Sequence, residues 1–195
     1  MFNLKKKNLK DLDLLLLFST LALCVYGLIV LYSAYGGDFS AIRTQIGSTI
    51  IGYLVIALLC TMDLDAIKKS MWFIYGLSIL LLIITLIFGR GLDEWGAKSW
   101  VYLGSFSIQP SEIVKILLIF SFASYLDRYK LSLNEVKRLI LTLAFVGIPV
   151  GLILLQPDFG TAMVYVFFIA AMLFVAGISW KWIIILLLAG LTVGF

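Results

Sequence analysis

Long apolar runs separated by short polar segments dominate this chain of 195 residues. An apolar run of about 20 residues is long enough to cross a bilayer as an α-helix. The pattern therefore predicts an all-α polytopic membrane protein. Six runs are predicted to be complete membrane-spanning helices: Leu14–Ala34, Ile46–Met62, Met71–Phe88, about Ser107–Leu126, Leu139–Leu155 and Thr161–Ile178.

A seventh apolar run begins at Trp182 and reaches the last residue, Phe195. Because a membrane helix needs about 20 residues and this run has about 14, we expect the chain to stop inside its seventh helix. Residues 1–195 are accordingly expected to form a single transmembrane domain, the N-terminal part of a longer protein.

Composition excludes several classes of function. Hydrophobic residues make up 63% of the chain and charged residues 13%, which is far from the balance of a soluble domain. The net charge of +4 comes from lysines and arginines near helix ends, without a basic patch interleaved with aromatic residues, so no nucleic acid partner is expected. The chain has no histidine, which excludes a Ser-His triad and most zinc sites. No metal ligands are therefore predicted, and acid–base work would fall to carboxylates, lysine or tyrosine.

Lysines and arginines also predict the orientation of the chain. If the N-terminus is cytoplasmic, the cytoplasmic segments hold 11 of these cations and the external segments hold 3. This asymmetry predicts a cytoplasmic N-terminus by the positive-inside rule. The loop Gly89–Phe106 and the turn Gln156–Gly160 would then be external.

The fourth predicted span contains charges at an unusual depth. Its uncharged stretch Ile116–Leu126 covers only about 16 Å of a hydrocarbon layer of about 30 Å. Gln109, Ser111, Glu112 and Lys115 should therefore lie below the outer headgroups, facing protein or a water-filled cavity. Glu112 and Lys115 are three residues apart on one helical face, so they can pair. Such a pair could line a cavity or could only fix helix packing.

A second polar segment, Gln156–Thr161, lies between the fifth and sixth predicted spans. Asp158 is placed to cap the sixth helix, and that cap could be its whole role. The second, fourth and sixth helices would all begin at the external surface, where helix N-termini favour anions. Arg43 and Gln45 lie near the start of the second helix, and Lys98 and Trp100 precede the fourth. If these ends converge, they would form a cationic pocket for a phosphate-bearing lipid.

Several motifs resemble signatures of the SEDS family (shape, elongation, division and sporulation proteins). They are Gly96–Trp100 followed by Gly104–Lys115, then Gln156–Thr161, and more weakly Arg43 with Gln45. The two main motifs occur in order and on the expected sides of the membrane, and the resemblance covers essentially the whole chain. Within the family the chain looks closer to RodA, the elongation member, than to FtsW or SpoVE.

The resemblance implies a peptidoglycan glycosyltransferase of the bacterial cytoplasmic membrane, which polymerises lipid II in cell-wall elongation or cell-shape control. Its partners would be lipid II, the growing glycan on undecaprenyl pyrophosphate, and a class B penicillin-binding protein that cross-links the strands. A carboxylate base would deprotonate the acceptor hydroxyl, and cations or a divalent metal (Mg²⁺ or Mn²⁺) would help the pyrophosphate to leave. The family's presumed catalytic aspartate lies in a large external loop after the seventh helix, beyond residue 195, so this part alone is expected to be inactive.

The resemblance also assigns supporting roles within this chain. Arg43 and Lys98 would hold phosphate charge, while Glu112 and Lys115 would shape the cavity. The full set of predicted substrate-binding or cavity residues is Arg43, Lys98, Trp100, Gln109, Ser111, Glu112, Lys115, Asp158 and Thr161. Two alternatives stay open: a flippase for the same lipid-linked precursor, and a truncated, non-catalytic membrane protein that binds a partner.

Overall fold

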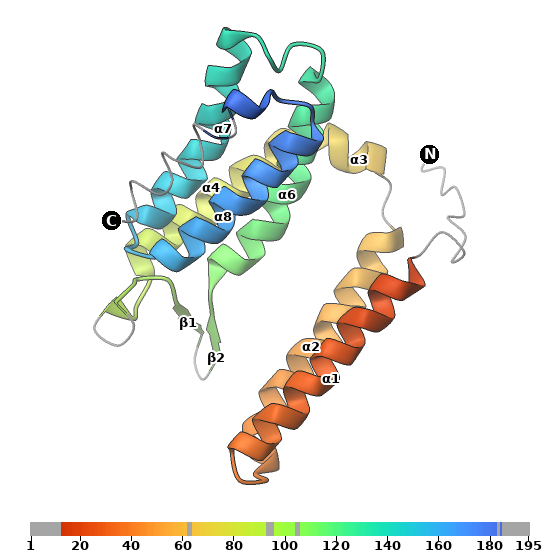
Figure 1. Ribbon diagram of the computed structural model, residues 1–195. Helices are drawn as coiled ribbons and strands as arrows, with labels where there is room; N and C mark the ends of the chain where they lie inside the picture. Colours follow the sequence, from red (N-terminus) through yellow and green to blue (C-terminus); the bar gives the residue numbers. More distant parts are fainter. Residues whose placement is uncertain (1–12, 62–63, 93–95, 104–105, 183, 185–195) are drawn as a thin grey trace. The chain divides into compact units, whose positions relative to one another are not determined.

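The computed structural model describes residues 13–61, 64–92, 96–103, 106–182 and 184. These residues are mostly helical and fall into two compact units, Met1–Leu64 (unit 1) and Asp65–Phe195 (unit 2). Figure 1 shows the helices and strands of each unit. We describe the two units separately.

Unit 1 is a hairpin of two long helices, α1 (Leu14–Ala34) and α2 (Phe39–Thr61). The Asp13 carboxylate caps α1 by accepting from the Leu16 N–H at 3.0 Å. Gly36 and Gly37 allow the tight connection because both adopt positive φ, at 64° and 85°. Almost every described side chain of the pair is at least partly exposed, as expected for helices that present apolar faces to lipid.

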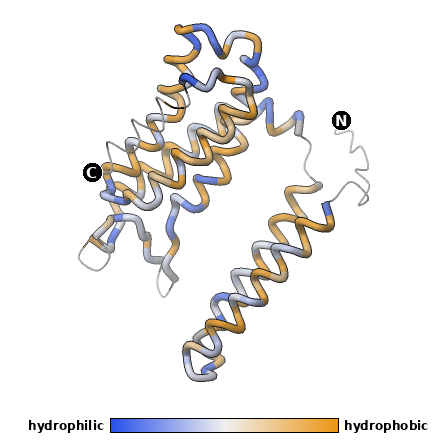
Figure 2. Tube along the Cα trace, viewed as in Figure 1, coloured by the Kyte–Doolittle hydropathy of each residue, from blue (hydrophilic) through white to orange (hydrophobic). Residues whose placement is uncertain are grey.

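Unit 2 begins with α3 (Leu64–Lys69) and α4 (Met71–Phe88) and continues through a β-hairpin to three further helices. These are α6 (Pro110–Tyr129), α7 (Val136–Leu154) and α8 (Phe159–Val175). Helix α4 packs against α6 and α7, and α8 packs against α7 and α6. Hydrophobic residues run along these helices and hydrophilic ones gather toward their ends (Figure 2). The fully buried side chains of the core include Leu82, Val114, Leu118, Phe122, Ile153, Tyr165 and Leu173.

Predicted spans and observed helices agree closely for most of the described chain. Leu14–Ala34 and Met71–Phe88 coincide with α1 and α4, and the ends of α7 differ from the prediction by at most three residues. Four described helices are long and apolar enough to span a membrane: α1, residues 42–61 of α2, α4 and α7. Helix α8 is apolar but shorter, with 17 residues, and α6 is not among the four. The predicted seventh span lies almost entirely outside the described residues.

The prediction of a helix from about Ser107, and of an entirely helical fold, is wrong at one place. Val101–Leu103 (β1) and Phe106–Ile108 (β2) form an antiparallel two-stranded sheet in which Tyr102 pairs with Ser107. The physical reason is Pro110, which disfavours helical backbone at the preceding residue. Gln109 accordingly has φ −97° and ψ 103°, and α6 begins at Pro110.

Candidate functional site

The N-terminal ends of α6 and α8 meet through side chains. Gln109 Nε2 donates to Asp158 Oδ2 at 3.0 Å and to Thr161 Oγ1 at 3.4 Å, although these residues are about 50 positions apart in the sequence. Asp158 Oδ1 accepts from the Thr161 N–H at 3.0 Å, which confirms the predicted N-cap of α8. Asp158 therefore has two roles, because one carboxylate oxygen caps α8 and the other connects α8 to α6.

The predicted Glu112–Lys115 pair is also confirmed. Lys115 Nζ donates to both carboxylate oxygens of Glu112, at 2.8 and 2.9 Å. In unit 2 the Glu112 side chain is 57% exposed and that of Lys115 is 24% exposed, so the pair lies at the surface of the unit. Because α6 starts at Pro110 and not at Ser107, the pair lies about 4.5 Å nearer to the expected membrane surface than the sequence predicted.

Ser111 lies beneath this pair and is almost completely buried. Its carbonyl accepts a hydrogen bond of 2.6 Å from the Tyr165 hydroxyl, a second connection between α6 and α8. Its own Oγ has no hydrogen-bond partner among the described residues. We call the following six residues the hairpin-end cluster: Gln109, Ser111, Glu112, Lys115, Asp158 and Thr161.

Gln156 joins three segments beside the hairpin-end cluster, and the sequence analysis did not select it. Its side chain is fully buried, and Nε2 donates to the Leu82 carbonyl of α4 at 3.1 Å. Its own carbonyl accepts from the Lys98 N–H at 3.0 Å. Its Oε1 has no partner within the described part of the chain. A glutamine between Leu155 and Pro157, at the end of an apolar run, was the available signal in the sequence.

Lys98 and Trp100 lie in the segment that leads into the β-hairpin. Lys98 is exposed, and Trp100 is partly exposed and forms an isolated antiparallel bridge with Arg90. Gly89 makes this approach possible, because a Cβ at its position would lie 2.5 Å from the Lys98 carbonyl oxygen. The structure therefore places the Lys98 backbone next to Gln156, on the same side of unit 2 as the hairpin-end cluster.

Arg43 belongs to the other unit. It is an exposed residue of α2, as is Gln45. Its predicted contribution to a shared phosphate pocket therefore stays a prediction, while the convergence of the α6 and α8 N-termini is confirmed.

The opposite end of unit 2 holds a separate charged group. Asp127 Oδ2 lies 2.8 Å from Lys68 Nζ, and its Oδ1 lies 3.6 Å from Lys130 Nζ. The hydrogen bond and the charge of Lys68 hold the pKa of Asp127 below its usual value, and Lys130 adds to this effect. In turn, the hydrogen bond to Asp127 and its charge raise the pKa of Lys68. These side chains are about half exposed, so the solvated loop carboxylate predicted at Asp127 is in fact an ion-paired one.

Comparison with known proteins gives consistent matches. The model of the FtsW/RodA/SpoVE family, described as "Cell cycle protein", matches residues 14–194. Peptidoglycan glycosyltransferase RodA of Treponema pallidum is 36% identical over 88% of this chain and 40% of its own length. Stage V sporulation protein E of Bacillus subtilis is 34% identical over 92% of this chain and 52% of its own length. The chain thus spans about half the length of the curated relatives it matches.

Solved structures match the fold as well. The crystal structure of the Thermus thermophilus rod shape determining protein RodA has a TM-score of 0.80 and 30% identity, covering 93% of this chain and 59% of that one. A second match, with TM-score 0.77 and 30% identity, covers 92% of this chain and 52% of its own; it belongs to work on "structural coordination of polymerization and crosslinking by a peptidoglycan synthase complex".

Proposed function

This chain belongs to the FtsW/RodA/SpoVE family, and from that membership we propose that the whole protein is a peptidoglycan glycosyltransferase that polymerises lipid II in cell-wall elongation or cell-shape control. It is a multi-pass protein of the bacterial cytoplasmic membrane. The observation that carries the proposal is the hairpin-end cluster, in which two helix N-termini and the Glu112–Lys115 pair come together at one end of an otherwise apolar unit.

The cluster suits a phosphate-bearing lipid. Helix N-termini favour anions, and the ammonium of Lys115 and the nearby exposed Lys98 add positive charge. In the proposed reaction the 4-hydroxyl of the acceptor sugar attacks the anomeric carbon of the donor glycan. The hydroxyl proton passes to a carboxylate base, and undecaprenyl pyrophosphate leaves with the electrons of the broken bond. The cationic end would stabilise the charge that develops on the pyrophosphate.

The cluster supplies binding and order, and we assign the base elsewhere. Both oxygens of Asp158 are engaged, with Thr161 and with Gln109, and both oxygens of Glu112 accept from Lys115. A carboxylate held in this way is poorly placed to take a proton from a substrate. We therefore place the catalytic aspartate beyond residue 195, in keeping with the family resemblance, and expect these 195 residues alone to be inactive. The roles of all nine predicted site residues are part of this proposal.

The proposed orientation has the N-terminus in the cytoplasm and six complete spans before a seventh. The 11 to 3 distribution of lysines and arginines supports it. In this orientation the hairpin-end cluster faces outward, where lipid II is polymerised. The single transmembrane domain over residues 1–195 likewise stays a prediction.

Partners and cofactor follow from the proposed reaction. The proposed partners are lipid II, the undecaprenyl-pyrophosphate-linked glycan and a class B penicillin-binding protein; the match to a peptidoglycan synthase complex supports the last of these. A divalent cation is a different matter. Within the described residues no group of three or more His, Cys, Asp or Glu side chains is placed to hold a metal ion. We therefore route no step of the reaction through one.

A polymerisation assay tests the proposal directly. The full-length protein in detergent, given purified lipid II, should produce glycan strands that a muramidase digests. Detergent removes the sealed compartment that flipping requires, so strand synthesis there would separate an enzyme from a flippase. Absence of strands, combined with lipid II transfer across sealed vesicles, would favour the flippase. Absence of both activities, with retained binding of a penicillin-binding protein, would favour the non-catalytic alternative.

A further inference from the structure

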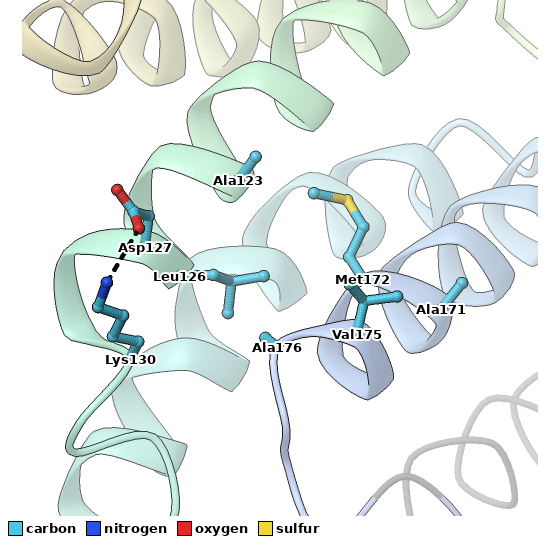
Figure 3. A pocket seen from close by; sticks show the side chains of 8 residues that line it. All are labelled: Ala123, Leu126, Asp127, Lys130, Ala171, Met172, Val175 and Ala176. Atoms are coloured by element: carbon cyan, nitrogen blue, oxygen red, sulfur yellow. Dashed lines mark ion pairs between the residues drawn. The ribbon is translucent and has the colours of Figure 1, made fainter. Parts of the chain in front are cut away.

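An apolar groove lies between α6 and α8, at the end of unit 2 opposite to the hairpin-end cluster (Figure 3). Its volume is about 510 Å³, within the range of about 300–1,000 Å³ usual for ligand sites. The two charged residues of its lining, Asp127 and Lys130, lie side by side at one edge. The remaining lining residues are all apolar: Ala123, Leu126, Ala171, Met172, Val175 and Ala176.

The charged edge has a cation to spare. Asp127 already pairs with Lys68 at 2.8 Å, whereas Lys130 lies farther from it, at 3.6 Å. The Lys130 side chain is 66% exposed, so its ammonium can meet a second anion. The described residues at this end of unit 2 carry an excess of positive charge: Lys68, Lys69, Arg128, Lys130, Lys137, Arg138 and Lys181 against Asp65, Asp127 and Glu135.

Exposed apolar side chains place this end of the unit at the membrane surface. Leu131, next to Lys130, is 97% exposed, and Trp180 is 62% exposed with its ring 4.7 Å from that of Phe174. Tryptophans of this kind favour the headgroup layer. The groove therefore opens where acyl chains meet headgroups, with its apolar wall toward the chains and Lys130 toward the headgroups.

We propose that this groove is a binding site for an anionic phospholipid, with one acyl chain along the α6–α8 wall and the phosphate at Lys130. The apolar wall favours a chain-bearing ligand over a free phosphate. A zwitterionic lipid carries its own ammonium group, so it gains less from a spare lysine. Basic pockets between membrane helices are recognised sites for anionic headgroups.

The test uses the full-length protein in detergent, with phosphatidylglycerol and phosphatidylcholine of identical acyl chains. Native mass spectrometry then counts the lipids that remain bound. We expect phosphatidylglycerol to be preferred, and Lys130→Gln to weaken its binding about fivefold with little effect on phosphatidylcholine. Lys137→Gln is the matched control, since Lys137 is exposed at the same end of unit 2 but does not line the groove.

A second pair of variants tests the groove itself. Ala123→Phe should fill the groove and reduce retention of phosphatidylglycerol, and Ala171→Leu replaces it if the larger change lowers the melting temperature. Equal retention of the two lipids would overturn the proposal. Equal effects of Lys130→Gln and Lys137→Gln would reduce it to diffuse surface attraction and so overturn it as well. Unchanged retention after the groove is filled would mean that another part of the protein occupies it.

Discussion

At the scale of single residues, the Glu112–Lys115 pair offers the sharpest test of the hairpin-end cluster. Glu112→Ala removes both acceptors of Lys115, whose side chain is only 24% exposed in unit 2. A hydrogen bond to a charged group is worth about 1.5–3 kcal/mol, so we expect polymerisation by the full-length protein to fall about tenfold or more. The rate of glycan synthesis from lipid II measures this.

Two controls separate function from folding at this pair. Glu135→Ala removes an exposed carboxylate at the other end of unit 2 and should leave the rate unchanged. The double variant Glu112→Ala/Lys115→Ala removes the stranded charge and should recover the melting temperature but not the rate. If the single variant melts early and still polymerises at the normal rate, the pair serves packing alone.

Asp158 has two measurable roles at the same scale. Asp158→Ala removes the cap of α8 and the bond to Gln109, each worth about 1 kcal/mol, so we expect a loss of about 2 kcal/mol in the free energy of unfolding. Gln109→Ala removes only the bond between the helices. Denaturant unfolding of the two single variants and the double variant should give a coupling of about 0.5–1.5 kcal/mol. Strictly additive effects would mean that the observed bond contributes nothing.

At the scale of elements, the close approach at the end of α4 explains the path of the chain into the β-hairpin. Gly89→Ala places a Cβ 2.5 Å from the Lys98 carbonyl oxygen, so the backbone must shift. We expect a loss of about 1–3 kcal/mol in the free energy of unfolding. Gly76→Ala is the matched control within α4, because no atom lies within 4 Å of its added Cβ. Since alanine is the better helix former, this control should be neutral or stabilising. Equal losses in both variants would contradict the observed contact.

The attachment of α3 to α6 should depend on pH. The pKa of Asp127 is lowered in the folded protein, so its pairing stabilises the fold above the ordinary value of 3.8 and the effect is lost as pH falls through the lower folded value. The pKa of Lys68 is raised, so its contribution is complete below 10.5 and is lost as pH rises through the raised value. Hydrogen exchange of the α3 amides should be slowest between these limits. In Lys68→Ala this dependence should disappear, and an unaltered profile would contradict the role of the pair.

Hydrophobic periodicity and length predicted most elements, and their failures have local causes. Leu14–Ala34 and Met71–Phe88 were predictable because long apolar runs end at polar or glycine residues. Strands β1 and β2 were missed because each has only three residues and lies in a region that reads as apolar. Spacing predicted the Glu112–Lys115 pair and the Asp158 cap, since both are local. The Gln109–Asp158 bond and the burial of Gln156 depend on tertiary packing, which one sequence cannot specify.

At the scale of the whole molecule, the arrangement of sites depends on orientation. The hairpin-end cluster suits an external lipid-linked sugar only if the N-terminus is cytoplasmic. The groove then belongs to the inner leaflet, where the positive-inside rule places the excess cations. One topology therefore fixes the sides of both proposals, although neither site depends on the chemistry of the other.

Cysteine labelling of the full-length protein in intact cells tests that topology. In a background with Cys24 and Cys60 replaced by alanine, Lys98→Cys and Leu131→Cys each introduce one exposed thiol, the first beside the hairpin-end cluster and the second beside the groove. A membrane-impermeant maleimide should label Lys98→Cys directly and should label Leu131→Cys only after the membrane is opened. Labelling after denaturation controls for thiol reactivity. The reverse pattern would place the hairpin-end cluster in the cytoplasm, where it could not act on externally displayed lipid II, and would remove the physical basis of the proposed reaction while leaving the lipid groove intact on the other face.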